Sequence, residues 1–236
     1  MINIINNILT SFGYQQANIE YSLDNLAMFL FIPASESNRE EYFVTLQLNI
    51  QSDESAQTIL EETAQELFES IRNSGKVERS FEKNCTMIIC HEDAMISRNT
   101  ILALEEDQYN FKKNVVTYAE HELHALKTHL SESGVEHLTN KIINEIINFG
   151  GGKRFLEFKN NHKNINDHYS LILKIALKLP FITYSPHEQQ LTNLSLEIEQ
   201  SFNHYQSVIF TQLMESGEWA DENTHQQVER IWGNIE

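Results

Sequence analysis

Leu26-Ala27-Met28-Phe29-Leu30-Phe31-Ile32 is an uninterrupted apolar run that stops at Pro33. A short apolar run with a breaker behind it is typical of a buried strand. Residues 41–50 follow, rich in aromatic and β-branched side chains, and predict a second strand. The polar residues 34–40 between the two runs fit a hairpin loop. The fold therefore starts from a sheet near the N-terminus.

The segments around this hairpin add helices and a further strand. Residues 2–12 have the spacing of a short amphipathic helix that ends at Gly13. A second helix opens at residues 52–55, where acids favour a first turn, and ends at Gly75. Residues 85–90 predict a third strand. We therefore expect an α+β domain over residues 1–98, a small mixed α/β layer of about three strands with packed helices.

After residue 99 the pattern is helical almost throughout, and we expect a mainly helical domain over residues 99–236. Thr100 can cap a helix that runs into the acids at 105–107. The further segments with helical periodicity are 118–130, 135–147, 167–179, 188–215 and 221–232.

The charge balance limits the function. The 236 residues carry 34 acidic and 17 basic side chains, a net charge of −17. Such a chain repels polyanions on average, so it is not an autonomous DNA or RNA binder. No stretch reaches the roughly 18 to 20 apolar residues that cross a bilayer. Without a secretory signal pattern, and with only two cysteines, the sequence predicts a cytoplasmic protein with reduced thiols and no membrane association.

One part of the chain is basic. Residues 141–178 hold seven bases against three acids, a net of +4. This island could contact a phosphate or an acidic partner through Lys153, Arg154, Lys159 and Lys163, or its lysines could simply be solvated and balance the acidic flanks.

The residues that could carry chemistry do not form a convincing catalytic set. His121 and His124 are three residues apart, whereas a helical zinc-protease motif needs four. Cys85 and Cys90 are five apart in an expected strand, which points them to opposite faces. The glycines 150–152 follow a helix and resemble a C-terminal cap more than a phosphate loop. We expect no metal, no cofactor and no catalysis.

The densest unusual string is Glu105-Glu106-Asp107-Gln108-Tyr109-Asn110-Phe111-Lys112-Lys113, which Tyr118 follows. Aromatic side chains supply much of the contact energy at interfaces. We therefore expect a partner-binding site here, made by Glu105, Glu106, Asp107, Tyr109, Phe111, Lys112, Lys113 and Tyr118.

The string 105–118 resembles a segment of the middle component of ABC-three-component systems, the small subunit of Lamassu-type antiphage and antiplasmid defence operons. Residues 83–90 resemble that family's preceding strand, residues 177–182 its later Leu-Pro segment, and residues 12–14 its opening. Gln108 and Thr117 stand where the family pattern has proline.

This resemblance implies a non-catalytic subunit that bridges an SMC-like ATPase and an effector nuclease and restrains the effector until foreign DNA is sensed. DNA would be reached only through the assembled complex. Two other functions stay open. The charge of −17 would suit an acidic DNA mimic that inhibits a nucleic-acid enzyme. A small hydrolase would use the region of His121 and His124, or the two cysteines.

Overall fold

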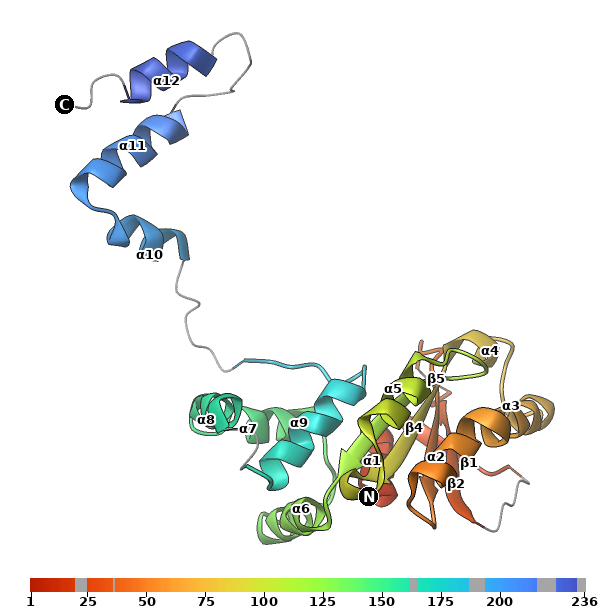
Figure 1. Ribbon diagram of the computed structural model, residues 1–236. Helices are drawn as coiled ribbons and strands as arrows, with labels where there is room; N and C mark the ends of the chain where they lie inside the picture. Colours follow the sequence, from red (N-terminus) through yellow and green to blue (C-terminus); the bar gives the residue numbers. More distant parts are fainter. Residues whose placement is uncertain (20–24, 36, 162–164, 187–193, 216–223, 233–236) are drawn as a thin grey trace. The chain divides into compact units, whose positions relative to one another are not determined.

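The computed structural model describes residues 1–19, 25–35, 37–161, 165–186, 194–215 and 224–232, drawn as a ribbon in Figure 1. Its contacts divide the chain into two compact units, Met1–His187 and Glu188–Glu236. All of the described strands lie in the first unit.

The first unit is built on one mixed sheet with the order β1-β2-β3-β4-β5. Its strands are β1 (Tyr14–Ala17), β2 (Leu26–Pro33), β3 (Tyr42–Leu48), β4 (Cys85–Glu92) and β5 (Lys112–Tyr118). β1, β2 and β3 pair antiparallel, so the expected hairpin is confirmed. β3, β4 and β5 pair parallel, with Tyr42 opposite Cys85 and Thr86 opposite Lys112.

Two of the strands were not expected from the sequence. β1 has only four residues, too few to show an alternating pattern. The helical reading of the chain after residue 99 was wrong at β5, because Val115-Val116-Thr117 is β-branched and both faces of the strand are packed, with Val115 in one core and Val116 in the other. The structure thus raises the strand number from about three to five, and the α+β class is confirmed.

Parallel strands need crossover connections, and helices on one face of the sheet supply them. Between β3 and β4 run α2 (Asp53–Thr58), the π-helical turn η1 (Ile59–Thr63), α3 (Ala64–Asn73) and the short α4 (Phe81–Asn84). Between β4 and β5 run the 3₁₀ turn η2 (Asp93–Met95) and α5 (Arg98–Glu106). These helices cover the sheet face that carries Val44, Met87 and Val115.

Other helices cover the opposite face. They are α1 (Ile2–Ser11), α6 (Glu120–Glu132), α7 (Asn140–Ile147) and α9 (His168–Lys178), with α8 (Lys153–Asn161) beside them. The core on this side includes Phe31, Phe43, Ile88 and Val116. Figure 1 shows α6 to α9 grouped on one side of the sheet and α2 and α3 on the other.

The two cysteines confirm the strand reading of residues 85–90. Cys85 lies in the core under α2, α3 and α5, whereas Cys90 lies in the core under α1, α6 and α9. They therefore point to opposite faces of β4. Burial raises the pKa of the Cys90 thiol to about 12 and that of Cys85 well above its usual value, so both thiols are protonated at neutral pH.

The helix boundaries follow the capping chemistry of the sequence. The Ser52 hydroxyl accepts a hydrogen bond from the Ser55 amide at 3.1 Å and begins α2. Ser97, rather than the expected Thr100, caps α5. The expected helix over 135–147 begins only at Asn140, after its cap Thr139. Gly150, Gly151 and Gly152 follow α7 with φ of +67°, +67° and +84°, which confirms the inter-helix turn.

The second unit contains α10 (Leu194–Ser201), α11 (His204–Glu215) and α12 (Thr224–Trp232). The single long helix expected over 188–215 is interrupted, because the Asn203 side chain accepts a hydrogen bond from the Gln206 amide at 2.9 Å and starts a new helix. Residues 188–193 and 221–223 of the two expected helices lie outside the described residues.

The expected domain boundary at 98/99 falls between β4 and β5 of one sheet, whereas the compact units divide after His187. Within the described residues no helix has both the length and the apolar character to span a bilayer.

Candidate functional site

A buried lysine organises the loop between α5 and β5. The Lys113 side chain is fully buried, and its Nζ lies 2.6 Å from Asp107 Oδ2. The same ammonium donates to the Tyr109 carbonyl oxygen at 2.8 Å, with weaker contacts of 3.4 Å to the carbonyls of Asp107 and Phe111. One cation thus satisfies several acceptors of residues 107–111. We call residues 107–111 the braced loop.

The brace separates the two aromatic residues of the loop. Phe111 is buried beside Phe68 and Phe81, with ring centroids 5.3 and 6.2 Å away. Tyr109 points the other way and is 81% exposed. Asn110 lies between them with φ +64°, in the left-handed region that non-glycine residues rarely adopt. The loop is therefore fixed in a conformation that presents one aromatic side chain to solvent.

Glu105 ties this corner to the rest of the first unit. Its Oε1 accepts a hydrogen bond from the Val115 amide at 2.9 Å and also pairs with the Lys178 ammonium of α9. Tyr118, at the other end of β5, is buried, and desolvation raises its pKa to about 12. Gln47 on β3 donates to its hydroxyl at 3.3 Å.

The eight residues expected to bind a partner thus fall into three groups. Phe111, Lys113 and Tyr118 are buried in the first unit, because β5 and the residue before it pack between helices on both faces of the sheet. Glu105 and Asp107 are partly buried and hold the corner together. The members that another molecule could touch are Glu106, Tyr109 and Lys112, all exposed.

A hollow lies directly beside Tyr109. It has a volume of about 580 Å³ and is lined by Leu60, Gln65, Asp107, Tyr109 and Asn110. Leu60 belongs to the π-helical turn η1, a kind of irregularity that is frequent at functional sites. Leu60 and Gln65 were not expected here, because the pattern over 52–75 is that of one regular helix and carries no signal for a π turn.

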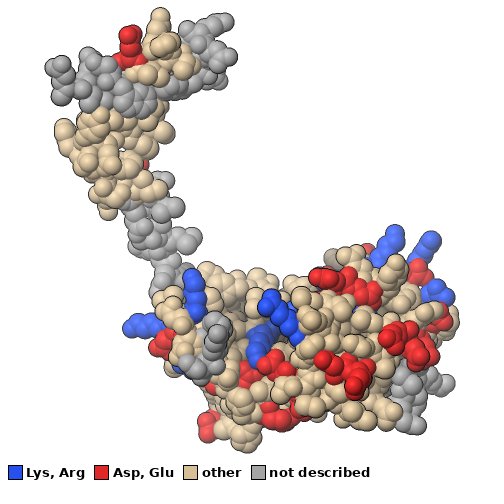
Figure 2. Space-filling model, in the orientation of Figure 1, with Lys and Arg blue, Asp and Glu red and all other residues tan. Residues whose placement is uncertain are grey.

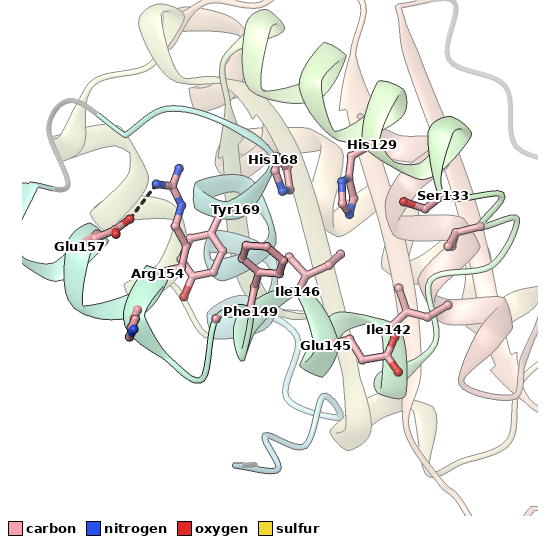
Figure 3. Close-up of a pocket in the computed structure, with 13 residues that line it drawn as sticks. His129, Ser133, Ile142, Glu145, Ile146, Phe149, Arg154, Glu157, His168 and Tyr169 are labelled. Atoms are coloured by element: carbon pink, nitrogen blue, oxygen red, sulfur yellow. Dashed lines mark hydrogen bonds and ion pairs between the residues drawn. The ribbon is translucent and has the colours of Figure 1, made fainter. Parts of the chain in front are cut away.

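A second hollow lies at the ends of α6 and α7 and the starts of α8 and α9. Its volume is about 700 Å³, and Figure 3 shows its walls. Val135, Ile142, Ile146 and Phe149 make the lining mainly apolar, and Phe149 is 71% exposed. The glycine turn 150–152 leads from Phe149 into α8.

Two histidines stack on the wall of this second hollow. The rings of His129 on α6 and His168 on α9 are 4.3 Å apart at their centroids and nearly parallel. Figure 3 shows the two side chains next to each other. Desolvation lowers the pKa of His168, and the neighbouring His129 lowers it further. The pair is therefore most stable with His168 neutral.

The Arg154 guanidinium pairs with two carboxylates, one of them at the start of α9, and is therefore not available as an anion-binding group. Its guanidinium forms ion pairs with Glu157 at 3.0 Å and with Asp167, whose side chain caps α9. Burial would raise the pKa of Asp167, but hydrogen bonds from Arg154 and from the Ser170 and Tyr169 amides lower it overall. Of the other expected contacts, Lys153 lines the second hollow and is exposed, as is Lys159, and Lys163 lies outside the described residues.

The histidine-rich start of α6 is divided between surface and interior. His121 and His124 are exposed, whereas Glu122 between them is fully buried. Glu122 accepts hydrogen bonds from the Ser170 hydroxyl at 2.6 Å and from the Lys174 ammonium at 2.9 and 3.1 Å. This carboxylate therefore joins α6 to α9. Over the described residues, no group of three histidine, cysteine or carboxylate side chains is arranged to hold a metal ion.

The architecture defines the class of protein, an α+β protein on a five-stranded mixed sheet. Residues 41–146 match the family model of the ABC-three component (ABC-3C) system Middle Component 1. The resemblance seen in the sequence is confirmed, and this part of the chain is similar to the middle component of such a system. The matched range includes η1, the braced loop and α6. Neither a curated protein nor a solved structure matches the chain significantly.

Proposed function

We propose that this protein is the non-catalytic middle component of a Lamassu-type defence complex. In this role it bridges an SMC-like ATPase and an effector nuclease and restrains the effector until foreign DNA is sensed. The family match over residues 41–146 carries the proposal, because it supports an accessory subunit of a three-component system. ATP hydrolysis and nuclease chemistry then belong to the other two subunits.

Two features of the first unit suit a bridging subunit. The braced loop presents Tyr109, and the second hollow presents Phe149 above an apolar lining. The hollow beside Tyr109 and the second hollow have no lining residue in common. The two surfaces can therefore act separately. A net charge of −17 also favours DNA contact through the ATPase rather than through this chain.

Co-expression with the ATPase and the effector encoded beside it tests this proposal. We expect a ternary complex on size exclusion, and we expect that the ATPase and effector fail to co-purify when this chain is omitted. The effector should also cleave DNA faster without this subunit than within the ternary complex before stimulation. If the ATPase and effector associate equally well without this chain, the bridging role is contradicted.

A further inference from the structure

The surface around Tyr109 is more than an exposed side chain. On one side of the braced loop, Tyr109 and Asn110 form a wall of the 580 Å³ hollow, and Leu60 of η1 lines it from across. We call Tyr109 and the residues of this hollow the Tyr109 surface. An exposed aromatic beside a recess is an arrangement that serves as an anchor in protein interfaces, and Leu60 supplies an apolar part of this otherwise mixed lining.

The Tyr109 surface is fixed before any partner arrives. The Lys113 ammonium holds the carbonyl of Tyr109 at 2.8 Å, and the Tyr109 amide donates to Asp107 Oδ1 at 3.2 Å. The backbone of Tyr109 is therefore held on both sides, although its side chain touches little. Such a loop loses little conformational entropy on binding, which raises affinity for a given contact area.

The charge around this surface has one dominant sign. Residues 59–73 and 106–112 contain, apart from Asp107 with its Lys113 partner, five acids against the two bases Arg72 and Lys112. The acids are Glu61, Glu62, Glu66, Glu69 and Glu106. Glu69 accepts a hydrogen bond from Gln65 at 3.2 Å, which places one carboxylate next to the lining of the hollow. Figure 2 shows acidic side chains on the side of the first unit that carries α2 and α3, with basic side chains at the upper edge of that side.

We propose that the Tyr109 surface docks a basic, amphipathic segment of another subunit. An apolar or aromatic side chain of that segment fills the hollow between Leu60 and Tyr109, and its lysines or arginines face Glu61, Glu62 and Glu106. The proposal rests on the proposed function, because it names the chemistry of one of the two partners. Complementary charge sets the orientation and the rate of association, while the apolar contact holds the complex.

A panel of three fluorescent peptides tests this with the isolated full-length chain. The first peptide is a helix of leucine and lysine with an apolar stripe. The second replaces its lysines by glutamates, and the third replaces its leucines by serines. By anisotropy we expect the first peptide to bind at least tenfold more tightly than either of the others.

Variants locate the binding. Tyr109→Ser and the double variant Glu61→Lys/Glu62→Lys should each weaken binding of the first peptide about tenfold or more. The matched controls Tyr184→Ser, a tyrosine that is also exposed, and Glu136→Lys should bind as the parent chain does. Circular dichroism checks that each variant is folded.

The proposal is overturned if the first peptide does not bind, if the acidic peptide binds as tightly, or if Tyr109→Ser leaves binding unchanged. These outcomes concern the isolated chain and leave the assignment to a three-component system in place. If the peptide binds as expected but no complex forms with the ATPase and effector, the proposed function fails instead.

Discussion

Lys113 Nζ lies 2.6 Å from Asp107 Oδ2, and the lysine side chain is entirely out of contact with solvent. Substituting Lys113→Met removes the donor to the carboxylate and to the Tyr109 carbonyl while keeping most of the apolar stem. A hydrogen bond to a charged group contributes about 1.5–3 kcal/mol, and less where the acceptors are partly open to water, as Asp107 is. We therefore expect the free energy of unfolding, measured with urea, to fall by about that amount.

The neighbouring lysine is the control for this prediction. Lys112 is exposed at the start of β5, so Lys112→Met should change the free energy of unfolding by less than about 0.5 kcal/mol. Equal effects of the two substitutions would show that the buried ammonium does not brace the loop.

A second buried charge joins two helices. Glu122 on α6 accepts from Ser170 and Lys174 on α9, and also from the Ala119 amide at 3.0 Å. Glu122→Leu removes hydrogen bonds to a charged group, each worth about 1.5–3 kcal/mol. We expect the urea midpoint to drop by an amount that corresponds to about 2 kcal/mol, because Lys174 is partly exposed and can turn to solvent. Glu120→Gln, an exposed first-turn substitution, should leave the midpoint nearly unchanged.

The sequence predicts the framework of the first unit well where local signals are strong. The sequence predicts the run 26–32, its hairpin partner and the strand 85–90, since apolar runs bounded by breakers favour strands, although in β2 only Leu30 and Phe31 are fully buried. β5 was missed because the charged string 105–113 looks like a solvated helix end, and only the pairing with β4 makes Lys113 an inward position. Because helices cover both faces of the sheet, a one-residue difference in strand position decides which of the two cores a side chain enters.

The candidate site was predicted only in part, for the same reason. Composition gives Tyr109 and Phe111 the same role, whereas the structure leaves Tyr109 exposed and buries Phe111. The contribution of Leu60 depends on a π turn that no periodicity reveals. The second hollow depends on how α6, α7, α8 and α9 meet, and that is tertiary information.

The stacked histidines predict sensitivity to mild acid. Because the pKa of His168 is lowered by folding, the unfolded chain takes up a proton first as the pH falls through about 6.5, and the folded state loses stability. We expect the melting temperature to fall between pH 7 and pH 5. His168→Phe keeps a flat ring against His129 but removes this titration, so its melting temperature should fall less over the same interval. The lowered pKa of Asp167 changes the stability only nearer pH 4, so it does not affect the melting temperatures compared between pH 7 and pH 5.

Phe149 gives the sharpest test that two separate surfaces serve two partners. Its side chain is 71% exposed beside the second hollow, so Phe149→Asp should leave the free energy of unfolding within about 0.5 kcal/mol of the parent. A charge at this position would nevertheless be costly to bury in an apolar interface. In the co-expression assay we expect Phe149→Asp to release one of the two other subunits and Tyr109→Ser to release the other. Leu102→Ser, an exposed apolar position on α5, is the control that should release neither. If both variants release the same subunit, the two surfaces form one docking site, and a bridge between two partners has to use another part of the chain.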